Sequence, residues 1–183
     1  MIVRLADPSR DAQAIAAIYR PAVEEGVASF EEVAPSAAEM AARMAAILER
    51  FPWLVAVEAD RVVGYAYAGP HRERPGYRWS VDISVYVDGA FHGRGIGRRL
   101  YDVLLPILRR QGMVNAYAGI TLPNPASVAL HRAIGMQPVG VYERVGFKRG
   151  AWHDVAHYQL RLADPPGVPP EPRPLTALPD APA

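Results

Sequence analysis

A glycine-rich loop is the part of the sequence whose residue types and spacing point most directly to chemistry. Residues 92–97 read His-Gly-Arg-Gly-Ile-Gly, follow a strand pattern and lead straight into a helical one. Glycine allows several backbone N–H groups to point into one concavity, and a helix N-terminus adds unpaired donors and the positive end of its dipole. The loop therefore indicates a phosphate or pyrophosphate site, with Arg94, Arg98 and Arg99 beside it. On this motif alone, a tight turn that only joins the two elements is an equal alternative.

Two ionisable side chains elsewhere are further candidates for chemistry. Asp82 interrupts an otherwise apolar strand pattern over 81–87. A carboxylate there needs a partner or a use, unless it faces solvent from an edge strand. His131 lies in a short helical pattern that begins after Asn124. A histidine there can exchange a proton near neutral pH, or it can be a satisfied residue on the helix surface.

The elements that must position these residues follow from the apolar pattern. Runs with strand and helix character occur in the order β-α-α-β-β-β-α-β-α-β-β, which predicts an α+β fold with helices packed on a largely antiparallel sheet. The expected strands are 2–5, 53–57, 62–68, 81–87, 116–120, 138–144 and 155–162. The expected helices are one that ends at Gly26, one that begins at Ser36 with Glu39 completing a capping box, one that runs from the glycine loop to Gly112, and one at 125–134.

The composition changes abruptly after Asp164. Eight of the last twenty residues are proline, and the apolar periodicity ends. We therefore divide the chain into one domain, 1–163, and a proline-rich tail, 164–183, which is predicted to be extended and weakly ordered. Its Pro-x-x-P spacing suits a proline-binding domain, although a passive tail is the commoner case for such composition.

The bulk properties of the chain restrict the class of protein. Half of its 183 residues are hydrophobic, 21% are charged and the formal net charge is +1. This composition is ordinary for a globular protein and provides no global field for nucleic acid or a membrane surface. The absence of cysteine excludes a disulfide, a thiolate nucleophile and a cysteine-ligated metal.

Location and partners follow from the same inventory. No signal-peptide pattern and no apolar run long enough to cross a bilayer are present, so a cytoplasmic protein without a membrane partner is expected. The arginines between 94 and 110 lack an accompanying platform of stacking aromatic residues, which disfavours nucleic-acid binding. No metal cofactor is expected.

The glycine loop resembles the pyrophosphate loop of the GNAT superfamily of N-acetyltransferases, whose pattern is Arg/Gln-x-x-Gly-x-Gly/Ala. The element order resembles that fold over nearly the whole ordered chain. Three further features resemble the phosphinothricin acetyltransferase branch: 51–56 with 67–70, 122–127 followed by His131, and 146–155. His92 departs from the Arg or Gln that is usual at the first loop position. We expect binding to survive this change, because most of the phosphate contact is made by backbone.

This resemblance implies a GNAT fold with a splayed seven-stranded sheet flanked by helices, and acetyl-CoA as the co-substrate. The strand at 81–87 would part from the one at 116–120, and the pantetheine arm would pair with backbone groups in the gap. A free N–H near Val85 would then stabilise the oxyanion of the tetrahedral intermediate. The expected cofactor contacts are Val85, Tyr86, Val87, His92, Gly93, Arg94, Gly95, Ile96, Gly97, Asn124 and Ser127. Plain helix capping is the alternative role for Asn124 and Ser127.

The resemblance also suggests catalytic roles. Asp82 matches a family glutamate that acts as general base, and because it is one methylene shorter we expect a water relay rather than direct proton transfer. His131 lies where the family places an ionisable residue near the departing sulfur. It could protonate the CoA thiolate or help to remove the proton of the amine. Tyr101, one turn after the glycine loop, either touches the sulfur region or packs in the core.

A substrate pocket is expected in two loops that would face the acetyl group. Its candidate residues are Phe30, Arg72, Arg74 and Tyr77. An arginine fork suits a carboxylate or phosphinate, and an aromatic wall suits a short side chain. Solvated loop charges are an equal alternative for the two arginines. The resemblance further implies a homodimer.

Together these features predict an enzyme that moves acetyl from acetyl-CoA to the amine of phosphinothricin, methionine sulfoximine, methionine sulfone or a similar small amino acid. The amine attacks directly, because no cysteine exists to carry a covalent intermediate, and herbicide resistance could be incidental to another role. The alternatives are acetylation of a polyamine, an aminoglycoside or a protein N-terminus, and a non-catalytic acyl-CoA-binding sensor. The loop arginines argue mildly against a cationic acceptor.

Overall fold

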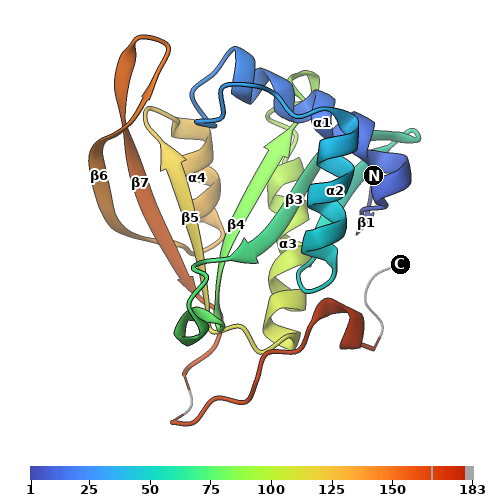
Figure 1. The fold of residues 1–183 in the computed structure, drawn as a ribbon, viewed down its shortest axis with the longest axis vertical. Helices are drawn as coiled ribbons and strands as arrows, with labels where there is room; N and C mark the ends of the chain where they lie inside the picture. Colours follow the sequence, from blue (N-terminus) through green and yellow to red (C-terminus); the bar gives the residue numbers. More distant parts are fainter. Residues whose placement is uncertain (166, 180–183) are drawn as a thin grey trace.

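The predicted order of elements is the order that the structure has (Figure 1). The computed structural model describes residues 1–165 and 167–179. Within them the strands are β1 (Ile2–Leu5), β2 (Trp53–Glu58), β3 (Arg61–Pro70), β4 (Ser80–Val87), β5 (Asn115–Thr121), β6 (Gln137–Lys148) and β7 (Ala151–Arg161). The helices are α1 (Pro8–Glu24), α2 (Ala37–Leu48), α3 (Ile96–Arg110) and α4 (Pro125–Ala133), with short 3-10 turns η1 (Pro75–Tyr77), η2 (Gly89–Phe91) and η3 (Leu175–Ala177).

The strands form one open sheet whose middle is split. Their order is β1-β2-β3-β4-β5-β7-β6, and β4 with β5 is the parallel pair among otherwise antiparallel neighbours. That parallel pairing covers only residues 80–82 against 115–117, whereas β4 stays paired with β3 as far as Val87. The arrows of β4 and β5 diverge from a common start in Figure 1. The predicted α+β fold with a splayed, largely antiparallel, seven-stranded sheet is confirmed.

Helices cover both faces of the sheet because its strands alternate apolar side chains between the two sides. In β2, Leu54 and Ala56 belong to the buried cluster that contains α3, whereas Trp53 and Val55 belong to the cluster that contains α1 and α2. This two-residue period is the one expected for a strand buried on both faces. The predicted capping box of α2, between Ser36 and Glu39, is present.

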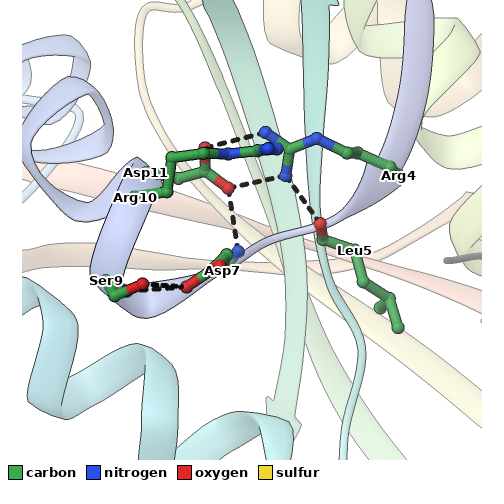
Figure 2. Close-up of polar contacts among 6 residues, drawn as sticks. All are labelled: Arg4, Leu5, Asp7, Ser9, Arg10 and Asp11. Carbon is green, nitrogen blue, oxygen red and sulfur yellow. Dashed lines mark hydrogen bonds and ion pairs between the residues drawn. The ribbon is translucent and has the colours of Figure 1, made fainter.

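A buried ion pair joins the first strand to the first helix (Figure 2). Arg4 donates two hydrogen bonds to the Asp11 carboxylate, at 2.6 and 2.8 Å, and the Asp7 amide donates a third at 2.8 Å. Burial by itself would raise the pKa of Asp11, but these donors hold it below its usual value. Asp7 also caps α1 by accepting from the Ser9 amide, so the start of α1 is fixed to the sheet.

The described part of the proline-rich tail packs against the domain. Leu175 and Leu178 are buried in the cluster that contains α3. The Leu175 amide donates to the Arg50 carbonyl, and the buried Gln111 side chain donates to the Arg173 carbonyl at 2.9 Å. The indole of Trp79 donates to the Pro170 carbonyl at 2.7 Å. Composition predicted an extended, weakly ordered segment. The described part of the tail has no regular structure apart from η3, and two of its side chains, Leu175 and Leu178, are buried.

This packing predicts that the tail contributes to stability. Leu175→Ala should lower the free energy of unfolding by about 2 kcal/mol, because it removes a buried side chain and leaves a cavity. Val168→Ala is the matched control, since that side chain is 91% exposed and its truncation should cost almost nothing. Urea denaturation followed by fluorescence measures both changes. Equal midpoints for the two variants would show that the tail is detached in solution.

Candidate active site

The glycine loop folds as an open turn at the N-terminus of α3. Gly93 and Gly95 have φ angles of 75° and 74°, and Gly95 is the N-cap. A Cβ on either residue would meet no described atom within 4 Å beyond its chain neighbours, so the backbone angle and not crowding requires glycine. The first bond of the helix runs from the Arg99 amide to the Gly95 carbonyl, and the amides before it point out of the helix end. We call residues 93–97 the cradle, because free amides at a helix N-terminus suit an anion, and anion binding there stays a prediction.

Side chains around this cradle are held by neighbours. The His92 ring donates from Nε2 to the Val87 carbonyl at 2.9 Å, which ties the loop to the end of β4. Arg94 pairs with Glu58 at 2.8 Å. Arg94 and Arg99 line a surface hollow of about 280 Å³ together with Met1, Glu58 and Ile96. A cation-lined hollow therefore adjoins the cradle.

The split sheet leaves one edge of β4 without a strand beside it. Beyond Asp82 the register pairs β4 with β3 only, including Val85 with Ala66 and Val87 with Gly64. The backbone groups on the other edge of this stretch face the gap toward β5. The side chains of this stretch pack into the protein: Tyr86 stacks on Tyr65 at a centroid distance of 5.4 Å, and Val85 and Val87 pack against the cluster that contains α3.

Asp82 lies where β4 and β5 part, and it has a partner that the sequence did not reveal. Its Oδ1 lies 2.7 Å from Nδ1 of His71, and the Asp82 side chain is 49% exposed. Burial raises the pKa of Asp82, while the hydrogen bond and charge of His71 oppose the rise. The His71 ring stacks on Tyr117 with centroids 4.3 Å apart. Tyr117 is the β5 residue that pairs with Asp82, so the cluster marks the point of the split.

A second histidine approaches the same cluster from β7. His157 pairs with Gly119 of β5 and packs its ring on Tyr142 at 4.2 Å. Its Nε2 atom is buried and has no hydrogen-bond partner among the described residues. Burial lowers the pKa of His157, and the nearby Asp82 opposes that shift. Neither His71 nor His157 was a sequence candidate. The one available signal was that His71 follows the resembling segment 67–70 directly.

His131 is buried and its ring is fully engaged. Nδ1 lies 2.8 Å from the Ser127 carbonyl, which can only accept, and Nε2 lies 3.0 Å from the Tyr101 hydroxyl. Burial lowers the pKa of His131 and raises that of Tyr101. A neutral ring that donates from Nδ1 and accepts the Tyr101 proton at Nε2 satisfies all of these contacts. The structure thus links His131 to Tyr101, in the core, and gives it no hydrogen bond to Asp82.

The other predicted residues divide into two groups. Asn124 caps α4 by accepting from the Ser127 amide at 3.1 Å. Arg72 donates to the His71 carbonyl at 3.0 Å, and the Tyr77 ring lies 6.1 Å from the His71 ring, so both adjoin the Asp82 cluster.

Among the described residues, no hydrogen bond, ion pair or ring contact joins Phe30 or Arg74 to that cluster. The Phe30 ring covers Gly146, where a Cβ would come within 2.3 Å of it. Lys148 closes the same region by donating to the Val23 and Ser29 carbonyls, each at 2.6 Å. Arg74 is exposed at the start of η1. The structure brings none of these side chains into contact with Asp82 within its described residues.

Comparison with known proteins decides the family. The family model described as the acetyltransferase (GNAT) domain matches residues 5–156. The chain belongs to the GNAT acetyltransferases. This GNAT enzyme is 36% identical to a phosphinothricin N-acetyltransferase of Streptomyces viridochromogenes over 169 residues, which cover 92% of this chain and 91% of the relative.

Two further comparisons place this GNAT enzyme within its branch. It is 37% identical to an L-methionine sulfoximine/L-methionine sulfone acetyltransferase of Salmonella typhimurium, over 88% of this chain and 95% of the relative. The crystal structure of a GNAT superfamily phosphinothricin acetyltransferase from Sinorhizobium meliloti in complex with AcCoA superposes with a TM-score of 0.88 at 38% identity, covering 93% of each chain. The predicted family and acetyl-transfer activity are confirmed.

The described residues show neither a membrane-spanning helix nor a cluster of metal ligands. None of their helices is both long and apolar enough to cross a membrane. The same part of the chain holds no group of three or more His, Asp or Glu side chains arranged to bind a metal ion.

The His131–Tyr101 pair supports a test of its protonation state. Tyr101→Phe removes the donor to a buried Nε2 and should lower the free energy of unfolding by about 1–2 kcal/mol. Because burial holds the pKa of His131 down, unfolding takes up a proton and stability should fall as the pH drops below about 6.5. Urea denaturation between pH 5 and pH 8 measures both effects. Tyr142→Phe, at a ring that is 52% exposed, is the control, and an equal loss in both variants would contradict the assignment.

Proposed function

We propose that this GNAT enzyme transfers acetyl from acetyl-CoA to the α-amine of phosphinothricin, methionine sulfoximine, methionine sulfone or a similar small amino acid. The observation that carries the proposal is the cradle at the N-terminus of α3 beside a split sheet, with a carboxylate where the split begins. Relatives named for these substrates are 36% and 37% identical to the chain over most of both sequences.

The cofactor would lie along the cradle and the split. The amides of 93–97 suit its diphosphate, because Gly93 and Gly95 hold the required backbone angles in open surroundings. The unpaired edge of β4 around Val85 and Val87 suits the amide groups of the pantetheine arm. The side-chain oxygen of Asn124 accepts a hydrogen bond in the α4 cap. Its NH₂ group is therefore left to donate to the pantetheine arm. When bound, acetyl-CoA supplies an activated acetyl thioester.

Groups of the chain itself stabilise the charge that develops during the reaction and transfer the protons. A free N–H of β4 near Val85 stabilises the oxyanion that forms when the amine attacks the thioester carbonyl. The Asp82 cluster takes the proton that the ammonium must lose before attack. His131 has both ring nitrogens engaged. It therefore transfers a proton only by exchanging its hydrogen bond with the Tyr101 hydroxyl.

Acid-group recognition is assigned to the loop between β3 and β4. Arg72 adjoins the Asp82 cluster and Arg74 is exposed on the same loop. Guanidinium groups bind carboxylates and phosphinates through paired hydrogen bonds. Two loop cations also repel a polyamine or an aminoglycoside, so an amino acid with an acidic group is the favoured acceptor.

Thiol release from acetyl-CoA, in the presence of a panel of amines, tests the activity. We expect release with phosphinothricin, methionine sulfoximine or methionine sulfone, and little with polyamines. Asp82→Asn should lower kcat by about 100-fold or more, since a positioned proton acceptor contributes about that much, and should leave the Kd for acetyl-CoA unchanged. Asp164→Asn, at a carboxylate that is 98% exposed, is the control. Binding of acetyl-CoA without thiol release from any amine would indicate the sensor instead.

We further propose that two copies of the chain associate through the β6 edge. β6 is the last strand of the sheet and presents a row of exposed apolar side chains, extended by Trp152 of β7. The row comprises Val139, Val141, Tyr142, Val145 and Phe147, each at least 49% exposed. An exposed apolar edge strand favours association, and a second copy of the chain offers a self-complementary partner.

A charge introduced on this edge tests the association. Val141→Glu should convert a dimer into a monomer in sedimentation velocity, because two copies would place like charges in an apolar contact. Val33→Glu, at a side chain that is 81% exposed and outside the row, should leave the dimer intact. A wild-type monomer at micromolar concentration would contradict the proposal.

A cytoplasmic location and a part in herbicide resistance stay predictions from the sequence.

A further inference from the structure

His71 is held in one orientation by three elements. Its Nδ1 lies 2.7 Å from Asp82 of β4, its face stacks on Tyr117 of β5, and the edge of Tyr77 from η1 approaches it. Its own amide donates to the Ser80 carbonyl, so the backbone at the end of β3 is fixed as well. Side-chain exposure is 19%, which leaves the ring accessible in part.

The contact with Asp82 determines which ring nitrogen is free. A separation of 2.7 Å between Nδ1 and a carboxylate oxygen requires a shared proton. A carboxylate only accepts, so a neutral ring carries its proton on Nδ1 and keeps the lone pair on Nε2. An oriented imidazole with this tautomer is the proton acceptor of the Ser-His-Asp hydrolases, where the carboxylate holds the ring and does not itself become protonated.

Chemistry and reach both favour the ring over the carboxylate. Histidine is the side chain that most often acts as a general base. Burial raises the pKa of Asp82, but one of its carboxylate oxygens is already bonded to His71. The ring extends the short aspartate by the length of an imidazole.

The charges that face His71 fit a ring that gains a proton transiently. Asp82 stabilises the imidazolium, whereas Arg72 on the same loop opposes it. His157 comes from β7, and burial disfavours its charged form, so it adds little positive charge. Tyr117 and Tyr77 are titratable side chains whose rings also contact His71. One carboxylate thus balances one permanent cation beside the ring.

We propose that His71 accepts the amine proton at Nε2 and that Asp82 is its orienting carboxylate. This inference rests on the proposed function. The ammonium N–H bond breaks, and its proton forms the Nε2–H bond of an imidazolium paired with Asp82. The freed amine lone pair attacks the thioester carbonyl. The C–S bond then breaks and the thiolate leaves with the electron pair. The attacking nitrogen loses its second proton on becoming an amide, the thiolate takes up that proton, and the ring returns the first proton to solvent.

The pH dependence of kcat/KM separates the ring from the carboxylate. In the wild type, kcat/KM should fall on the acidic side, because only the neutral ring accepts a proton. His71→Asn should lower kcat about 100-fold or more, abolish that acidic limb and leave the Kd for acetyl-CoA unchanged. Adding Asp82→Asn to His71→Asn should cost little more, since the two residues act as one unit. Glu73→Gln on the same loop is the control and should match the wild type.

Nitrogen-15 NMR of the histidine rings supplies a readout independent of turnover. The wild type should show His71 with its proton on Nδ1, and Asp82→Ala should abolish that preference. A wild-type proton on Nε2, or His71→Asn with wild-type kcat and an unchanged acidic limb, would overturn the role of His71 while leaving the proposed acetyl transfer standing. Wild-type protein that releases no thiol with any amine would refute the proposed function, and the role of His71 with it.

Discussion

The early end of the β4–β5 pairing is the constraint on which the rest of the site depends. Three residue pairs join the two strands, after which β4 follows β3 and β5 follows β7. Backbone groups along one edge of β4 are therefore left to a ligand, because a sheet that stayed paired would use them itself. The cradle at the start of α3 opens at the far end of the same edge, so in the proposed function one local feature positions both the diphosphate and the reactive arm of the cofactor.

The split also creates the electrostatic setting of the proposed proton acceptor. Asp82 is the last β4 residue paired with β5, and the opening of the sheet admits both solvent and the His71 ring beside it. Burial alone would favour a protonated carboxyl group, while the hydrogen bond to His71 favours the ionised one. A carboxylate and an imidazole held together in this way form a more adaptable proton acceptor than a solitary short aspartate.

One edge strand of the sheet is the proposed site of association, and the other is anchored to a helix. The order of strands puts β6 at one edge with its apolar side chains exposed, which is the basis for the proposed dimer. At the other edge, β1 is anchored to α1 through the Arg4–Asp11 pair. The described tail contacts Trp79 directly before β4, so the chain's last segment supports the loop that carries the proposed substrate residues.

Local patterns in the sequence determined the order of strands and helices, the glycine cradle, the capping box at Ser36 and the position of Asp82 in a strand, because each depends on neighbours within a few residues. The tertiary structure decided that His71 meets Asp82, that the half-buried His157 lies near them and that Tyr101 donates to His131. Those partners are separated by 11 and 30 residues where they bond, and no period in the sequence relates them. It also decided that leucines of a proline-rich tail enter the core. Pairings of this kind arise only when the sheet register brings distant segments together, and the amino-acid composition does not specify that register.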